Sequence, residues 1–215
     1  MEIKLRGRTI NVRKWKVKDR TNYINAQDPI LKRQALVYNC LDDPNTPLDI
    51  EEYNYVLLYL RSISVSDIIK YKIKCPECGN EFNANINLSD VLNINFDSYK
   101  PIIVDDISID LFNVQNKQAY ETRINSVQDL YTKYLIDFCF HIKSISRNQS
   151  YTFDDIFNYI NDLDSDVFDE IFKQWENQRF KLQLYTSIQC PYCEYTNTYN
   201  MDTLPNFFPE SWKIN

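Results

Sequence analysis

The sequence predicts an α+β protein in which a helical body carries several β-hairpins. Apolar residues recur at helical spacing in some segments and alternate with polar residues in others. Of the 215 residues, 44% are hydrophobic and 14% are aromatic, which is enough for a folded core. We expect one compact domain with these segments: a basic N-terminal β-hairpin (1–20), a helical segment (21–66), two halves of a β region (67–100 and 179–203), an inserted β and helical region (101–178) and an aromatic C-terminal tail (204–215).

The first elements are a hairpin and two helices. Residues 3–17 alternate apolar and polar side chains on both sides of Gly7, which is typical of a strand, a turn and a second strand. Gly7 is one of only two glycines, and a hairpin turn is where a positive φ is needed. Residues 18–42 are expected to form two short helices, broken at Asp28-Pro29.

A better-marked helix is expected at 47–63. Thr46 would cap this helix and Pro47 would occupy its first position, because proline there loses no hydrogen bond. The apolar residues that follow recur at helical spacing. Two strands are then expected on either side of a pair of cysteines, at 68–75 and 80–87.

The second half of the chain repeats this alternation of element types. A β-rich stretch covers 101–114. Three helices are expected to begin at polar caps, which are Ser126, Thr152 and Ser165. Strand-like alternation returns around a second pair of cysteines, at 179–190 and 194–201.

The strongest chemical signal is a pair of Cys-Pro-x-Cys motifs, Cys75-Pro76-Glu77-Cys78 and Cys190-Pro191-Tyr192-Cys193. Gly79 follows the first motif, where a tight knuckle needs a positive φ. A Cys-x-x-Cys turn aims two sulfurs at one point, and two such turns complete a tetrahedral shell of four thiolates. We therefore predict a split four-cysteine zinc ribbon formed by two distant knuckles, with one structural zinc per chain bound by Cys75, Cys78, Cys190 and Cys193.

Two other interpretations of the cysteine pairs stay open. An iron centre would use the same four thiolates. Redox-active pairs would need a thioredoxin-like βαβ context, and the pattern around these motifs has none. A catalytic zinc keeps an open coordination position, whereas four thiolates close the shell, so we expect the metal to be structural.

Composition argues against several enzyme classes. Two glycines leave no glycine-rich phosphate loop. The single histidine, His141, stands two residues from Cys139 in a predicted helix, so these side chains do not face each other as a nucleophile and its base would. Cys40 and Cys139 lie on apolar helix faces and are expected to be buried free thiols. We expect no catalytic residue, no small-molecule substrate and no enzymatic activity.

Charge is distributed unevenly. The net charge is -6, but the first 20 residues hold eight basic residues against two acidic ones, so this segment carries +6 and the remainder -12. The basic segment is either a solvated face or a contact surface for an acidic partner, and the large aromatic residues either anchor a partner or close the chain's own core. The residues we expect to bind a partner are Arg6, Arg8, Arg13, Trp15, Lys16, Phe207, Phe208 and Trp212.

No membrane or secretion signal is present in the sequence. No run of about 18 apolar residues exists, and the N-terminus lacks an apolar core of the kind that signal peptides have. We therefore expect a protein made in a reducing cytoplasm, where paired cysteines bind metals more often than they form disulfides.

The order of these features resembles the baseplate hub or hub assembly protein family of T-even-type contractile-tailed bacteriophages. The features that carry the resemblance are Arg13-Lys14-Trp15-Lys16-Val17-Lys18-Asp19, Ile50-Glu51-Glu52, Leu60-Arg61-Ser62 running into the first cysteine pair, the helix pair from Phe153 to Trp175, the second cysteine pair and the terminal Phe207-Phe208. The resemblance covers about residues 1–210.

This resemblance implies a non-enzymatic structural or assembly component of a phage tail baseplate hub. Its partners would be other baseplate and hub proteins, first in the host cytoplasm and then in the virion tail baseplate. Whether the protein stays in the particle or leaves as an assembly chaperone stays open. The alternative is a zinc-ribbon nucleic-acid-binding or transcription-accessory protein, which the basic first 20 residues favour and the acidic remainder disfavours.

Overall fold

A computed structural model describes residues 1–94, 96–146, 151–179, 182 and 185–200. The first part of the chain folds as a two-stranded sheet and three α-helices around one hydrophobic core. Its elements are β1 (Glu2–Leu5), β2 (Arg8–Asn11), α1 (Val17–Asn25), α2 (Pro29–Leu36), a 3-10 turn (Tyr38–Cys40) and α3 (Ile50–Ser64). The predicted N-terminal hairpin is confirmed, and Gly7 has a φ of +64° at its turn.

The second strand of this hairpin is shorter than predicted. It ends at Asn11, whereas the alternation predicts strand as far as residue 17. Helix α1 begins at Val17 because the Asp19 carboxylate accepts a hydrogen bond from the Lys16 amide at 2.7 Å, which satisfies a free backbone donor at the helix start. The alternating sequence pattern continues through the helix cap, so it did not show that the strand ends before it.

The helical segment that follows is confirmed with a corrected boundary. Asp28 caps α2 by accepting a hydrogen bond from the Ile30 amide at 2.6 Å, so the predicted break lies where expected. Helix α3 begins at Ile50 and not at residue 47, and its cap is Asp49. The Pro47 carbonyl accepts a hydrogen bond from the Arg8 guanidinium at 2.6 Å, which holds this segment outside the helix.

Two hairpins carry the cysteine motifs, as predicted. In the first, β3 (Ile68–Lys74) pairs with β4 (Glu81–Asn87), and a short α4 (Leu88–Leu92) follows. Burial alternates strictly along β3, where the apolar side chains of Ile69, Tyr71 and Ile73 lie inside. In the second hairpin, β8 (Tyr185–Gln189) pairs with β9 (Thr196–Asn200).

The inserted region forms a second lobe with a three-stranded sheet and four helices. Its elements are β5 (Ile102–Val104), β6 (Ile107–Leu111), α5 (Lys117–Ser126), α6 (Leu130–Phe140), β7 (Ile142–Ile145), α7 (Phe153–Asn161) and α8 (Ser165–Gln178). The sheet has the order β5-β6-β7, and its core contains the fully buried Phe138, Ile171 and Trp175. The strands at 101–114 and the Thr152 capping box are confirmed.

Two elements of this lobe were missed, and two predicted caps were misplaced. Helix α5 has almost no amphipathic pattern, and Ser126 is its last residue rather than the cap of the next helix. Asp129 caps α6, and Asp164 precedes α8, of which Ser165 is the first residue. Strand β7 was not predicted, because a four-residue segment in which Ile142 and Ile145 are apolar fits a helical period as well as a strand.

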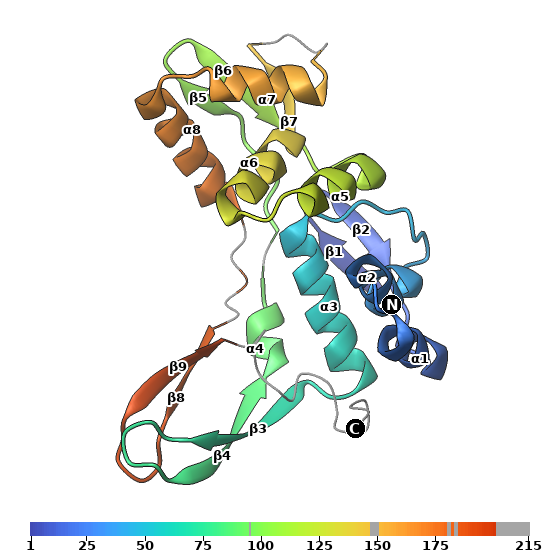
Figure 1. Ribbon diagram of the computed structural model, residues 1–215, viewed down its shortest axis with the longest axis vertical. Coiled ribbons are helices and arrows are strands. Elements are labelled where there is room, and N and C mark those ends of the chain that lie inside the picture. The colour runs from blue at the N-terminus through green and yellow to red at the C-terminus, as the bar shows by residue number, and fades with distance from the viewer. Residues whose placement is uncertain (95, 147–150, 180–181, 183–184, 201–215) are drawn as a thin grey trace.

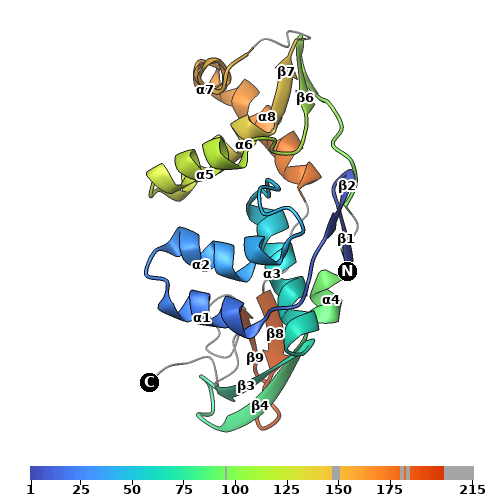
Figure 2. The same cartoon turned by 90° about the vertical axis from the view of Figure 1, so that its right-hand side faces the viewer.

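Figure 1 shows the inserted lobe stacked above the N-terminal lobe, with the two cysteine hairpins extending together from the lower end. Figure 2, turned by 90°, shows the same stacking, with α2 facing α5 across the boundary between the lobes. No helix in the described ranges has the length and apolar character needed to cross a bilayer. The predicted aromatic tail at 204–215 lies outside the described residues.

Candidate metal centre

The two cysteine motifs form knuckles with the same backbone geometry. Cys75 directly follows β3, and its amide donates to the Asn80 carbonyl at 2.9 Å. Cys190 directly follows β8, and its amide donates to the Tyr195 carbonyl at 2.8 Å. Each knuckle is therefore closed by the strand pair beneath it, which fixes the direction of its two sulfurs.

The knuckles bring all four motif sulfurs together, as the sequence predicted. The four Sγ atoms lie within 4.8 Å of one another, and no His, Asp or Glu from the described residues belongs to this cluster. Cys75 Sγ lies 3.7 Å from Cys193 Sγ, and Cys78 Sγ lies 3.7 Å from Cys190 Sγ. Four sulfurs at about 2.3 Å from one tetrahedral ion would be about 3.8 Å apart, whereas a disulfide needs about 2.05 Å. The arrangement fits a four-thiolate metal shell.

The ionisation of the thiols shows why this site suits a cation. Desolvation acts to raise the pKa of Cys190, but hydrogen bonds from the backbone amides of Tyr192 and Cys193 outweigh it and lower that pKa to about 7. The Tyr195 amide lowers the pKa of Cys193, but the neighbouring cysteines outweigh it and raise that pKa to about 12. Four thiolates this close repel one another, so a bound cation is what allows all of them to ionise together.

The site joins segments that are far apart in the sequence. The paired sulfurs of Cys75 and Cys193 are separated by 118 positions, and those of Cys78 and Cys190 by 112. Ile188 of β8 also packs against the core beneath β3 and β4. A metal in this shell would close a long loop and would fix the second hairpin against the first.

The other two cysteines are buried free thiols, as predicted. Cys40 lies in the core of the N-terminal lobe and Cys139 in that of the inserted lobe. Burial raises the pKa of each thiol to about 12, so both stay protonated and unreactive at neutral pH. Neither contributes to the metal cluster.

Arg6 and Arg8 both form polar contacts with other residues of this chain. Arg6 is only 5% exposed, and its guanidinium donates to the Asp97 carbonyl at 2.9 Å and the Gln178 carbonyl at 2.7 Å. Arg8 pairs with the buried carboxylate of Glu52. The basic charge of the hairpin is thus partly used to hold the fold.

Arg13 and Trp15 are also held by this chain. The Arg13 guanidinium donates to both carboxylate oxygens of Asp19, at 2.7 and 3.0 Å. The Trp15 indole is partly buried and donates to the Leu36 carbonyl at 2.7 Å. Lys16 is exposed. The other expected partner-binding residues, Phe207, Phe208 and Trp212, lie outside the described residues.

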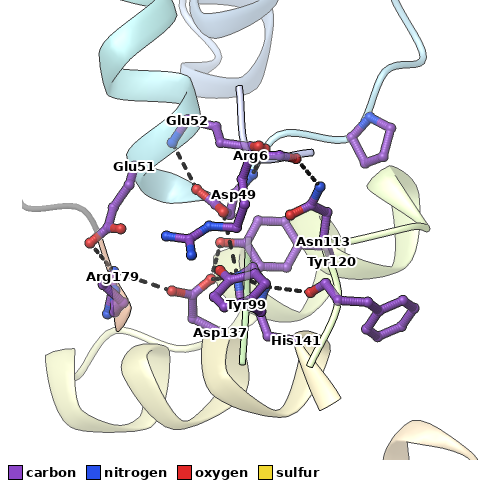
Figure 3. A network of polar contacts seen from close by, with 12 residues as sticks. Arg6, Asp49, Glu51, Glu52, Tyr99, Asn113, Tyr120, Asp137, His141 and Arg179 are labelled. Carbon is purple, nitrogen blue, oxygen red and sulfur yellow. Dashed lines mark hydrogen bonds and ion pairs between the residues drawn. The ribbon is translucent and has the colours of Figure 1, made fainter. Parts of the chain in front are cut away.

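A buried polar network between the two lobes was missed by pattern reasoning (Figure 3). Arg179 directly follows α8, and its side chain is 6% exposed. Its guanidinium lies 2.6 Å from Glu51 Oε1 in α3 and 3.4 Å from Asp137 Oδ2 in α6. This arginine therefore ties the end of the inserted lobe to the N-terminal lobe.

His141 is the second centre of this network. Its Nδ1 lies 2.9 Å from the Phe112 carbonyl, which only accepts, so Nδ1 is the donor there. Its Nε2 lies 3.5 Å from Asp49 Oδ2 and 3.7 Å from Asp137 Oδ1. Desolvation raises the pKa of Asp137, although His141 and Arg179 act to lower it. His141 thus lies between the carboxylate of Asp49, which caps α3, and that of Asp137 in α6.

No local motif marks this network, because its members come from separate elements across most of the chain. The sequence offers a single histidine and many acidic residues, and no local pattern pairs them. Which of them meet depends on how the lobes stack, and sequence spacing does not contain that information.

Together, the fold and the site define a mixed helical and β protein with small sheets, in which two knuckles assemble one four-cysteine cluster that could hold a metal ion. The chain matches, over residues 1–209, the model of the family described as T4 bacteriophage base plate protein, and it belongs to that family. The predicted resemblance is thereby confirmed at the level of a T4-type baseplate protein. Searches of curated proteins and of solved structures found no match.

Proposed function

We propose that this chain is a non-enzymatic structural or assembly component of the tail baseplate hub, stabilised by one structural zinc. The family match over residues 1–209 carries the proposal, because it covers both cysteine knuckles and both lobes. The protein would assemble with other baseplate and hub proteins in the host cytoplasm and would then occupy the virion tail baseplate.

Zinc is the metal that the donor set favours. Four soft thiolates in tetrahedral geometry suit zinc, which has no redox chemistry and no geometric preference of its own. The 3.7 Å sulfur separations fit the Zn–S distance of about 2.3 Å. A closed shell of four protein ligands supports a structural role rather than a catalytic one.

The buried position of His141 supports a non-enzymatic role. The side chain is 2% exposed, and each of its two ring nitrogens faces a polar group of the protein. A general acid or base must reach a substrate directly or through one water. The network that holds His141 therefore suits lobe-to-lobe attachment better than proton transfer.

A partner surface is supported best at the start of α1. Lys14, Lys16 and Lys18 are all exposed there, and Val17 between them is 82% exposed. A basic surface with an apolar centre suits an acidic partner with a small apolar patch. We propose that Lys16 and its neighbours dock first, with the tail residues Phe207, Phe208 and Trp212 as further anchors.

The test is incorporation into particles. Phage carrying the triple substitution Lys14→Glu, Lys16→Glu and Lys18→Glu should contain less of this chain than wild-type phage, as measured by quantitative mass spectrometry of purified virions. Lys173→Glu, an exposed change on α8, is the matched control and should leave the content unchanged. Normal incorporation of the triple variant would contradict the proposal that these lysines dock the chain. Absence of the wild-type chain from hub subassemblies as well as from virions would remove the hub proposal.

A further inference from the structure

The boundary between the two lobes is mainly polar. The core of the N-terminal lobe and the core of the inserted lobe are separate clusters of buried residues. Among the residues of the N-terminal lobe that the structure describes, Ile50 is the one that packs against an apolar cluster of the inserted lobe. Parts of a chain move relative to each other unless a large apolar interface holds them. The orientation of the two lobes therefore depends on their polar contacts.

Three hollows along this boundary leave it loosely packed, and each is lined by residues of both lobes. The largest, of about 880 Å³, lies between α2 and α5. Two smaller hollows, of about 260 and 210 Å³, are both lined by Arg179. An interface packed as tightly as a protein core would leave few spaces larger than a water molecule. The inserted lobe therefore has room to tilt without steric overlap.

The chain crosses between the lobes twice, and Arg6 holds both crossing segments. The first crossing leads from α4 to β5, and the return begins at Gln178, the last residue of α8. The buried Arg6 guanidinium donates to the carbonyls of Asp97 and Gln178 and lies 3.8 Å from the centre of the Tyr99 ring. The Lys100 amide donates to the Gln178 side chain at 2.6 Å. These contacts tie the two segments together, where the green chain before β5 passes β1 and β2 (Figure 2).

The α2–α5 side of the boundary lies across the molecule from this tie (Figure 2). The Lys117 ammonium of α5 donates to the Pro44 carbonyl at 2.6 Å and lies 3.5 Å from the centre of the Tyr38 ring. The Arg33 guanidinium of α2 lies 3.8 Å from Glu121 Oε1, which is longer than a hydrogen bond. Long side chains therefore close this side across the largest hollow.

Arg179 and His141 hold the lobes together between these two sides. Arg179 pairs with Glu51 of the N-terminal lobe and with Asp137 of the inserted lobe, and His141 lies beside Asp49. Charged contacts of this kind are strong while they are dry and weaken steeply when water enters between the charges. They fix one orientation of the lobes while they are formed and resist little once they are broken.

We propose that the inserted lobe is hinged to the N-terminal lobe at Arg6 and opens on the α2–α5 side, with Arg179 and Lys117 holding the closed orientation. Hinges of this type absorb the change in a few residues between two folded bodies. Residues 101–178 hold 14 acidic and 6 basic residues, whereas residues 1–100 hold 13 acidic and 15 basic ones. Opening therefore turns an acidic lobe relative to the basic surface around Lys16, so the chain presents two different shapes to its partners.

The test measures the relative orientation of the lobes in the full-length protein, from residual dipolar couplings of backbone amides in a neutral aligning medium. In the wild type, the couplings of both lobes should fit one alignment tensor. The double variant Lys117→Gln/Arg179→Gln should need two different tensors, because its lobes reorient independently. The matched control is Arg123→Gln/Lys173→Gln, which removes the same charge from contacts made within the inserted lobe and should behave as the wild type does.

Three results would overturn the inference: one shared tensor in the double variant, two tensors in the wild type, or two tensors in the control. Amide hydrogen exchange checks that both lobes of each variant are folded. If the double variant is not folded, Lys117→Gln and Arg179→Gln are measured singly, and one shared tensor in both overturns the inference. The measurement needs neither a partner nor virions, so its failure would leave the proposed function intact.

Discussion

Gly79 and Glu194 occupy equivalent positions in the two knuckles, and both have a left-handed backbone, with φ values of +72° and +60°. Each amide donates back to the first cysteine of its motif, Gly79 to the Cys75 carbonyl at 2.9 Å and Glu194 to the Cys190 carbonyl at 3.0 Å. A side chain in this conformation costs about 1 kcal/mol or more, and glycine avoids that cost. The second knuckle therefore forms at a backbone cost that the first one avoids.

Exchanging residue types at these positions should change stability in opposite directions. Glu194→Gly should raise the free energy of unfolding of the metal-loaded protein by up to about 1 kcal/mol, and Gly79→Ala should lower it by about the same amount. A Cβ at Gly79 would meet nothing within 4 Å, so the expected loss is conformational and not steric. Urea unfolding under reducing conditions measures the free energy of unfolding of both variants. If Glu194→Gly lowers this free energy as much as Gly79→Ala does, the left-handed backbone at Glu194 is not a cost that glycine relieves.

Removing the imidazole of His141 should destabilise the protein more than a packing change would. His141→Gln removes the ring that donates to the Phe112 carbonyl and that lies beside the buried carboxylates of Asp49 and Asp137, and leaving buried polar groups unpaired costs about 1 to 3 kcal/mol. The matched control is Asp154→Asn, which breaks the exposed pair with Arg123 and should cost less than about 1 kcal/mol. Equal unfolding midpoints for the two variants would show that His141 only fills space.

Stability should fall as the pH rises from about 5 to about 7. Desolvation raises the pKa of Glu51 from its ordinary value of 4.5 to about 7, although Arg179 acts to lower it. A carboxyl group with a raised pKa in the folded state binds its proton more tightly there than when unfolded. Its contribution is therefore complete below pH 4.5 and is lost as the pH rises through 7, with a slope of up to about 1.4 kcal/mol per pH unit.

The glutamine variant isolates this contribution. Glu51→Gln should flatten the pH dependence of the free energy of unfolding between pH 5 and about 7, whereas Glu170→Gln, an exposed change on α8, should leave it as in the wild type. Chemical unfolding at several pH values gives both slopes. A slope in Glu51→Gln identical to that of the wild type would mean that Glu51 keeps its charge throughout, stabilised by Arg179.

The sequence predicted the local elements and the cysteine cluster because both depend on short-range patterns. Alternation in Ile69, Tyr71 and Ile73 predicted β3, and the Cys-x-x-Cys spacing predicted which four cysteines cluster, without knowledge of the tertiary fold. The polar α5 carries little periodic signal and was missed. The contacts of Arg179 with Glu51 depend on how the lobes stack, which no local pattern encodes.

The placement of the basic residues shows the same limit. Their clustering in the first 20 residues was visible, but whether each faces solvent or a carboxylate was not. Arg8 and Arg13 meet Glu52 and Asp19 inside the chain, so charge reversal there would disturb the fold as well as any interface. For that reason the docking test uses the exposed lysines around Lys16 instead.

The most direct test of the proposed structural metal site is the metal content of the purified chain, measured by inductively coupled plasma mass spectrometry on protein prepared under reducing conditions. We expect one zinc per chain in the wild type and in Cys139→Ala, and none in Cys78→Ser or Cys193→Ser, with a large loss of stability in the two serine variants because metal binding and folding are coupled. A wild-type chain that is folded and free of metal, or one whose stability does not change when a chelator removes the zinc, would contradict a fold held by this site.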